Sequence, residues 1–259
     1  MLASFDWSVL WDRMFGVDSA FGRALFATVY ISVLAQLLGI VLGLVAALMR
    51  MSRNRVLKVL SGLYVWFFRG TPVIVQIFFV YLGVNILFGV TLIPNALHLG
   101  LFTLGGAAFA GILALGVNEG AYMREIIRAG IDAIDKGQLE AARSLGMTYG
   151  LAMRRIVLPQ AARVIVPPLG NEFNNMLKTS SLVFFIGVQE LFGNADIFYS
   201  QTFKPVEAFF AVALWYLLLT TIWTWIQARI ERRLAVSERD LEEIRFRERL
   251  RDAWALRRA

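Results

Sequence analysis

The sequence predicts an all-α fold: a polytopic membrane protein with five transmembrane helices. Hydrophobic residues make up 58% of the 259 residues and the mean hydropathy is +0.62, whereas soluble domains contain about 45–50% apolar residues. Long segments carry no charged residue, and basic residues gather between them. The chain contains no cysteine, which excludes disulfides, thiolate metal sites and cysteine nucleophiles.

The N-terminal segment, residues 1–23, is expected to lie at the external membrane surface, because its apolar side chains recur among acids at the spacing of one helical face. It lacks the basic start, apolar core and cleavage site of a removed signal peptide. Residues 24–49 carry no charge over more than the roughly 20 residues that cross the hydrocarbon core, and they form the first predicted span. Gly39 and Gly43 within it suit close helix packing.

Residues 50–58 contain four basic residues and no acid, as a cytoplasmic loop does under the positive-inside rule. The N-terminus is therefore expected outside. No charged residue occurs from Gly70 through Asn118, a stretch too long for one helix and sufficient for two. We place the second span at about residues 61–88, an external turn at about 89–100 and the third span at about 101–123.

Residues 119–163 are expected in the cytoplasm because they contain seven basic residues. The fourth span is predicted from about residue 161 to 188, and the fifth covers 208–228 without a charge. Five spans place the C-terminus inside. The tail, residues 234–259, mixes acidic and basic residues and is expected to form a charged, solvated cytoplasmic helix.

The distribution of basic residues supports this topology. Segments expected in the cytoplasm hold four, seven and ten basic residues, whereas those expected outside hold three. This asymmetry accounts for the net charge of +7 and the pI near 10. Nucleic-acid binding therefore gains little support from the charge.

The sequence contains no phosphate-binding loop, no paired-histidine metal motif and no Gly-x-Ser-x-Gly elbow. We therefore expect no catalytic residue, no metal site and no cofactor in this chain. It is not predicted to be an enzyme.

A charged, helix-forming segment interrupts the apolar pattern at residues 140–159. It begins Glu140-Ala141-Ala142, continues through three residues to Gly146, and reaches Ile156-x-Leu158-Pro159 after nine more. This spacing resembles the signature of permease subunits of bacterial ABC importers. Further motifs resemble the branch that takes up polar amino acids, the histidine, glutamine and arginine permeases, and the likeness spans about residues 22–233. These motifs are Arg69-Gly70-Thr71-Pro72 with Gln76, Ala121-Tyr122, Lys136-Gly137-Gln138, Leu158-Pro159-Gln160-Ala161 and Pro168-Leu169-Gly170-Asn171.

The resemblance implies a type I permease fold in the inner membrane, with a permease domain at 24–233 and a coupling loop at 124–160. In this family a short coupling helix sits in a groove of a separate ATPase, which binds the ATP. The residues that match this role are Gln138, Glu140, Ala141, Ala142, Arg143, Leu145, Gly146, Leu158 and Pro159. Such a short helix is marginal alone and needs docking, and Gly146 can end it in a left-handed conformation. Without the signature, an ordinary amphipathic connector would be the simpler interpretation.

The fourth span carries polar residues at helical spacing, and ionisable groups at membrane depth usually face a bundle interior or a wet cavity. They are Asn171, Glu172, Asn174 or Asn175, Lys178 and Thr179. We interpret them as a substrate path in which Glu172 and the asparagines hold an amino acid's ammonium group or side chain. The alternative is a Glu172–Lys178 or Glu–Asn pairing that only joins helices.

Other polar residues in the apolar segments are weaker pathway candidates or structural ones. Gln76 and Glu119 are further pathway candidates, although Glu119 is more simply solvated or paired with Arg124. The segment Arg69, Gly70, Thr71 and Pro72 is expected to be a structural or gating element. Many relatives have Lys-Asp-Thr/Ser-Ser where this chain has Lys178-Thr179-Ser180-Ser181. This chain therefore lacks a carboxylate that could balance Lys178, and a substrate preference that depends on charge does not carry over from those relatives.

These features predict a permease subunit that forms half of an amino acid pathway. Its expected partners are an ABC ATPase dimer, a second permease that is identical or homologous, an extracytoplasmic substrate-binding protein, the amino acid and the lipid bilayer. The main alternative is an ion-coupled secondary transporter or channel, which needs its own coupling carboxylates and often shows inverted repeats. A membrane scaffold or sensor is the second alternative.

Overall fold

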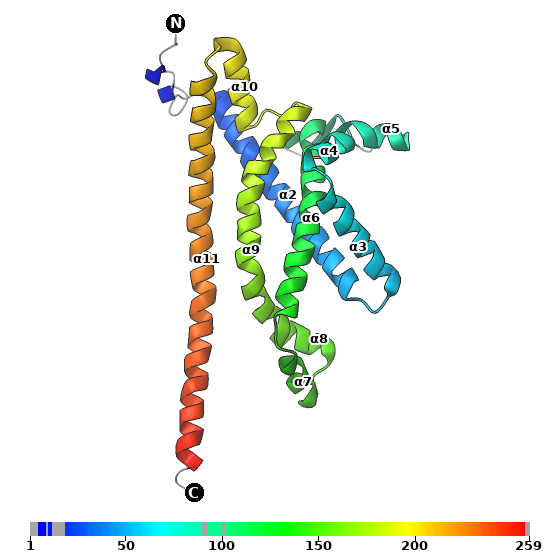
Figure 1. Ribbon diagram of the computed structural model, residues 1–259, viewed down its shortest axis with the longest axis vertical. Helices are drawn as coiled ribbons and strands as arrows, with labels where there is room; N and C mark the ends of the chain where they lie inside the picture. Colours follow the sequence, from blue (N-terminus) through cyan, green and yellow to red (C-terminus); the bar gives the residue numbers. More distant parts are fainter. Residues whose placement is uncertain (1–4, 9, 12–18, 90–92, 100–101, 257–259) are drawn as a thin grey trace.

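The computed structural model describes residues 5–8, 10–11, 19–89, 93–99 and 102–256. Four long helices form an elongated bundle (Figure 1). They are α2 (Ser19–Met51), α6 (Gly106–Asp132), α9 (Leu158–Thr179) and α11 (Pro205–Leu256). The shorter helices α7 (Lys136–Ser144) and α8 (Tyr149–Ala152) lie together at one end of the bundle, whereas α10 (Leu191–Thr202) lies at the other (Figure 1).

Helix α2 packs along the central helix α6 because glycines replace side chains where the two meet. A Cβ built on Gly43 would lie 2.3 Å from the Cβ of Met123, and one on Gly39 would lie 2.6 Å from the Cγ of Glu119. Small residues at this spacing let two helix backbones approach closely inside a membrane. The predicted role of the Gly39 and Gly43 pair in close packing is confirmed.

Buried apolar side chains form separate clusters along the described part of the bundle. One joins α2, α4 and α6 around Ile31, Ile77 and Leu115. Another, at the same end as α10, includes Phe21, Leu191, Phe198 and Val212. A further cluster lies toward α7 and includes Ala47, Met123, Ile127, Val157 and Ala161. Helix α6 thus contributes to two of these clusters, whereas α11 contributes to the one near α10.

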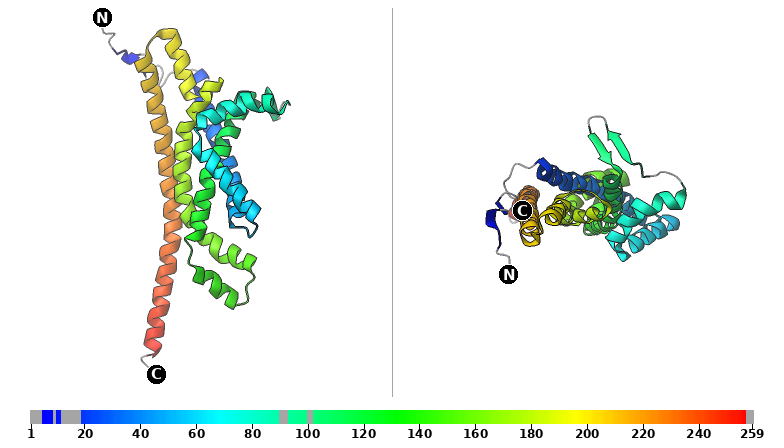
Figure 2. Two further views of the ribbon diagram at one scale, coloured as in Figure 1. Left: turned by 45° about the vertical axis from the view of Figure 1, so that its right-hand side comes forward. Right: turned by 90° about the horizontal axis from the view of Figure 1, so that it is seen from above.

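The second predicted span is a broken helix, which corrects the expectation of one continuous helix at 61–88. Helix α3 (Arg55–Gly70) ends before Thr71, and the chain then bends by 106°. Because Pro72 has no backbone N–H and disfavours a helical residue before it, Thr71 is extended, with φ −117° and ψ 145°. The second arm comprises α4 (Val73–Phe78), the π-helical η1 (Phe79–Gly83) and α5 (Val84–Phe88), and it points away from the bundle (Figures 1 and 2).

A β-hairpin that the sequence did not reveal overlaps the end of the predicted external turn and the start of the predicted third span. Strand β1 (Ala96–Leu99) pairs antiparallel with β2 (Phe102–Gly105), so that His98 lies opposite Thr103. Helix α6 consequently begins at Gly106 rather than near residue 101, and it continues to Asp132, past the predicted end near residue 123.

The fourth predicted span also changes direction. The segment before it contains the π-helical η2 (Met153–Val157), and α9 is followed by the 3-10 helix η3 (Ser180–Ile186). A 50° bend then leads into α10, which no predicted span included. Helix α11 begins three residues before the predicted fifth span and continues unbroken to Leu256, so the charged tail is helical, as predicted.

Among the described residues, two helices are long and apolar enough to cross a membrane, Phe21–Met51 and Pro205–Leu234. Two bent pairs meet the same requirement when each is taken as one span: Arg55–Gly70 with Val73–Phe88, and Tyr149–Ile186 with Leu191–Thr202. Together with α6, these segments do not conflict with the five predicted spans.

Candidate functional site: a polar cavity and an exposed connector

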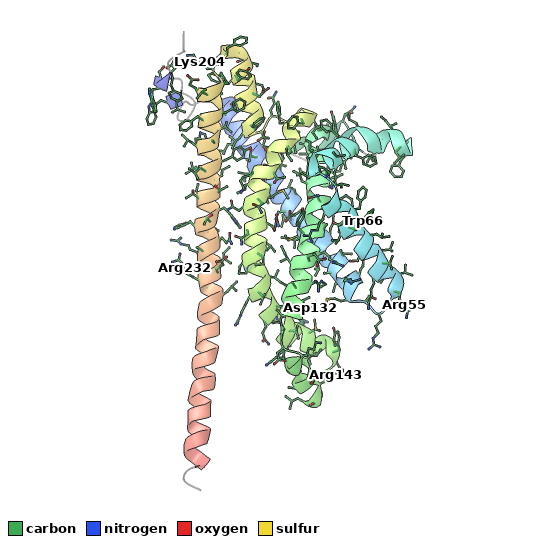
Figure 3. The ribbon with its side chains drawn as sticks, viewed as in Figure 1. Arg55, Trp66, Asp132, Arg143, Lys204 and Arg232 are labelled. Carbon is green, nitrogen blue, oxygen red and sulfur yellow. The ribbon has the colours of Figure 1, made fainter. Side chains whose placement is uncertain are left out.

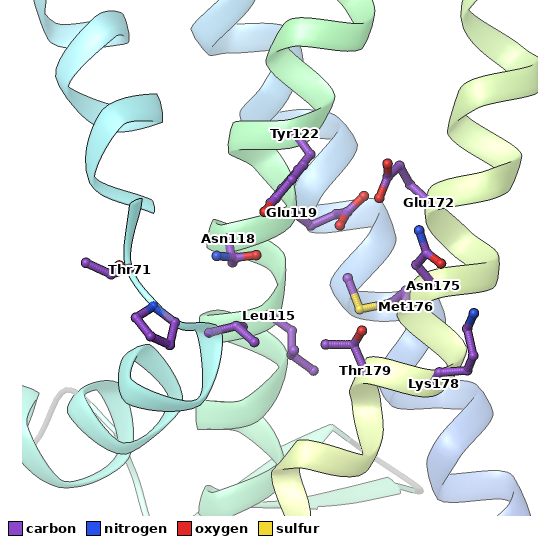
Figure 4. Close-up of a pocket in the computed structure, with 12 residues that line it drawn as sticks. Thr71, Leu115, Asn118, Glu119, Tyr122, Glu172, Asn175, Met176, Lys178 and Thr179 are labelled. Carbon is purple, nitrogen blue, oxygen red and sulfur yellow. The ribbon is translucent and has the colours of Figure 1, made fainter. Parts of the chain in front are cut away.

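A polar cavity of about 570 Å³ lies between the α3–α4 bend, α6 and α9. Figure 4 shows its side chains converging from these elements. The lining residues are Thr71, Pro72, Val73, Leu115, Asn118, Glu119, Tyr122, Glu172, Asn175, Met176, Lys178 and Thr179. Their position between membrane-spanning helices makes the cavity the strongest candidate for a solute site.

Two carboxylates face each other across this cavity, Glu119 from α6 and Glu172 from α9 (Figure 4). Glu119 is only 6% exposed, and its Oε1 atom has no hydrogen-bond partner among the described residues. A buried polar atom without a partner is costly, and functional sites are a common reason for it. Like charges in a poorly solvated space repel each other and attract a cation. The pair therefore suits a positively charged group.

The two ion pairs that would give these carboxylates a purely structural role are not among the described contacts. No salt bridge joins Glu172 to Lys178 within the described part of the chain. Arg124 is paired with Glu125 rather than with Glu119, and its Nε donates to Ser61 Oγ at 3.2 Å. The cavity thus retains both carboxylates, while Asn175 and Thr179 provide neutral polar groups on the same side of α9.

Asn171 does not belong to this cavity, although it was predicted as a pathway residue. Its Oδ1 accepts a hydrogen bond from Gln227 Nε2 of α11 at 3.2 Å, and the same nitrogen donates to Pro167 O at 3.2 Å. Trp223 Nε1 of α11 donates to Gly170 O at 2.7 Å. Successive residues of a helix lie about 100° apart, so Asn171 joins α9 to α11 while Glu172 faces α6.

Gln76, another predicted pathway residue, is 6% exposed and stabilises the bend after α3 instead. Its Nε2 donates to Phe68 O at 3.0 Å, Thr71 O at 3.1 Å and Thr71 Oγ1 at 2.7 Å. Asn118 Nδ2 donates to Phe68 O at 2.8 Å and to Gln76 Oε1 at 3.0 Å. These donors satisfy carbonyl groups that the end of a helix leaves unpaired.

The predicted structural or gating segment lies at this bend. Thr71 and Pro72 line the cavity, and the guanidinium carbon of Arg69 lies 5.0 Å from the centre of the Tyr122 ring, a cation–π distance. Asn118 was missed by sequence reasoning. Its position four residues before Tyr122 was a usable signal, because residues at this spacing share one face of a helix.

The connector between α6 and α9 comprises residues 133–157. It lies at the end of the bundle where Arg143 is labelled in Figure 3. Asp135 begins α7 by accepting a hydrogen bond from Gly137 N at 2.9 Å. Gly146 ends it with φ +81°, and Met147 N donates to Ala142 O at 3.1 Å, as in a Schellman motif. The predicted left-handed conformation of Gly146 is confirmed.

The exposed side of the connector carries both charge and apolar surface. Ala142 is buried at 2%, whereas Leu145 is 84% exposed. Glu140, Ala141 and Arg143 are also exposed. Leu145 is followed by further exposed apolar residues, which are Tyr149, Leu151 and Leu158. An exposed segment with this mixed charged and apolar surface is suited to binding another protein.

Comparison with known proteins identifies the family. The family described as "Binding-protein-dependent transport system inner membrane component" matches residues 39–236. The chain is 42% identical to "Arginine transport system permease protein ArgU" of Corynebacterium glutamicum, over 82% of this chain and 68% of that protein. It is 38% identical to "Probable amino-acid permease protein YxeN" of Bacillus subtilis, over 87% of this chain and 96% of that protein.

Solved structures show the same fold. A chain of "an amino acid ABC transporter with histidines" has 38% sequence identity and a TM-score of 0.75, covering 89% of this chain and all of that one. A chain of the MetNI methionine ABC transporter has a TM-score of 0.68 at 18% identity, which shows the fold alone. The predicted resemblance is thereby confirmed, and the chain belongs to the family of inner membrane components of binding-protein-dependent transport systems.

Proposed function

We propose that this chain is the permease subunit of an ABC importer for polar amino acids and forms half of the translocation pathway. The observation that carries this proposal is the cavity in which Glu119 and Glu172 face each other within a membrane bundle. The names of the relatives, which include arginine and glutamine permeases, support amino acid transport. The family is a transport component rather than an enzyme, so ATP hydrolysis belongs to a separate chain.

The cavity favours amino acids with a cationic group. An ammonium or guanidinium group between the two carboxylates would relieve their repulsion and provide the missing partner for Glu119 Oε1. Asn175 and Thr179 can hydrogen-bond the rest of a polar solute. The arginine permease among the relatives agrees with this class of substrate.

The connector is the docking segment for the ATPase dimer. Glu140 and Arg143 of α7 supply charge, Leu145 supplies apolar contact, and Gly146 turns the chain back toward the bundle. The positive-inside rule places this end in the cytoplasm of an inner membrane and the N-terminus outside. A second permease, identical or homologous, encloses the cavity from its open side, and an extracytoplasmic binding protein delivers the solute at the other end.

Uptake in proteoliposomes tests the proposal. The chain, its partner permease and the ATPase are reconstituted together, the extracytoplasmic binding protein is added on the opposite side of the membrane, and import of labelled arginine is measured with and without ATP. Glu140→Lys is expected to reduce ATP-dependent uptake by about tenfold or more while membrane insertion remains normal. The reversed charge at position 140 would repel the basic group of the ATPase that the glutamate contacts. Arg53→Glu, a charge reversal at an exposed residue between α2 and α3, is the control and is expected to transport normally.

Wild-type uptake by Glu140→Lys would contradict the role of the connector. Uptake driven by an ion gradient without the ATPase would instead support the secondary transporter, an alternative for which the comparisons give no support. Absence of transport by the intact complex would favour a scaffold or sensor.

A further inference from the structure

The N-terminal segment is docked on the start of α11. The backbone N–H of Asp6 donates to Glu207 Oε1 at 2.9 Å, and Lys204 Nζ donates to Asp6 Oδ2 at 2.6 Å. The Phe5 ring meets the Phe210 ring edge to face, with centroids 6.1 Å apart. Residues separated by about 200 positions are thus held together by an ion pair, a hydrogen bond and an aromatic contact.

The Asp6 carboxylate is satisfied locally, and both tryptophans of this segment are largely exposed. Asp6 Oδ1 accepts hydrogen bonds from Ser8 N at 3.0 Å and from Ser8 Oγ at 2.6 Å. Leu10 is buried at 5%, whereas Trp7 is 64% exposed and Trp11 is 58% exposed. Residues four positions apart share one face of a helix, so the two indoles extend a common surface away from the protein.

Phe203, next to Lys204, adds a third exposed aromatic residue at this end. It is 81% exposed and ends α10 with φ 55° and ψ 31°. This left-handed conformation favours glycine and is strained for a bulky side chain. A large apolar side chain in water gains no compensating contact, whereas an apolar or interfacial environment would stabilise Phe203 in this exposed position.

The location of these residues identifies that environment. The apolar spans begin at Phe21 in α2 and at Pro205 in α11, so the segment lies level with the ends of both spans and opposite to α7 and α8 (Figures 1 and 3). In the view from above in Figure 2, the N-terminal segment lies on the flank of α11, away from α6 and α9. Below it, α11 exposes apolar residues such as Leu217 and Ile222, which a bilayer covers in a spanning helix.

We infer that Trp7, Trp11 and Phe203 form an interfacial anchor that lies among the lipid headgroups of the leaflet opposite α7 and α8. Indole rings combine an apolar body with a polar N–H and concentrate at this level of a membrane. The lateral position favours lipid over a binding protein, which would approach along the bundle axis. The Asp6–Lys204 ion pair holds the anchor on α11.

Spin labelling tests the anchor directly, because the natural chain contains no cysteine. Trp11→Cys and Phe203→Cys are each labelled in the full chain, which is reconstituted in vesicles of phosphatidylcholine and phosphatidylglycerol. Accessibility to oxygen and to a water-soluble nickel chelate is then measured. Leu217→Cys provides the lipid reference and Leu145→Cys the water reference, since both side chains are exposed. Labels at positions 11 and 203 are expected to lie between the two references, at headgroup depth.

The role of the ion pair is tested by charge reversal. Lys204→Glu is expected to shift the label at position 11 toward the water reference, because it places like charges beside Asp6 and Glu207. Adding Asp6→Lys is expected to restore headgroup depth. The inference is overturned if both labels resemble the Leu145 reference, or if both are inaccessible to oxygen and chelate alike, which would indicate coverage by a protein.

Discussion

Glu119 and Glu172 give the cavity its chemical character. Glu119 comes from the tightly packed α6, where Gly39 of α2 leaves room for its side chain, whereas Glu172 lies on the half-exposed face of α9. One carboxylate is therefore held rigidly and the other borders a more open space. This asymmetry suits a solute that enters past Glu172 and then contacts the buried Glu119.

Neutralising Glu172 tests this arrangement. Glu172→Gln keeps the shape of the side chain and removes its charge, so uptake of arginine is expected to fall by about 10- to 150-fold, the value of one charge-assisted hydrogen bond. Glutamine uptake is expected to change less. Asn171→Ala is the matched control, because Asn171 contacts α11 rather than the cavity. If arginine uptake fell equally in Glu172→Gln and Asn171→Ala, the assignment of the cavity as the solute site would be contradicted.

At the level of helices, the contact between α2 and α6 has little room for added atoms. Gly43→Ala would place a Cβ 2.3 Å from the Cβ of Met123, and overpacking of this kind costs about 1–3 kcal/mol. Gly22→Ala is the control in the same helix, because nothing lies within 4 Å of its added Cβ. Removing a helical glycine without a clash stabilises by up to about 1 kcal/mol.

Thermal unfolding of the purified protein distinguishes these outcomes. The midpoint is expected to fall for Gly43→Ala and to stay level or rise for Gly22→Ala. A rise for both variants would show that α2 and α6 are less closely packed than the structure indicates.

The helices themselves were largely predictable, since uncharged segments and basic loops follow from the cost of charge in hydrocarbon. Contacts between distant segments were not. The bend at Thr71 follows locally from Pro72, but its stabilisation by Asn118 depends on α6 lying alongside. In the same way, Asn171 and Glu172 are equally polar in the sequence, and only the position of α11 shows that one of them faces Gln227.

Across the whole molecule, the connector and the anchor occupy opposite ends, and this arrangement predicts a fixed orientation. Gly150→Cys on α8 and Gln201→Cys on α10 introduce single cysteines at exposed positions. A membrane-impermeant maleimide is expected to label position 201 in right-side-out vesicles and position 150 only in inside-out vesicles. Labelling of both positions from one side would contradict the topology derived from the basic residues.

Helix α11 also has a mechanical consequence. It runs without interruption from Pro205 to Leu256, through 52 residues, so it is about 78 Å long, compared with roughly 30 Å of hydrocarbon. If its outer end is fixed at the membrane surface, each degree of tilt moves its inner end sideways by about 1.4 Å. A tilt of a few degrees thus becomes a displacement of several ångströms at the Leu256 end of the helix.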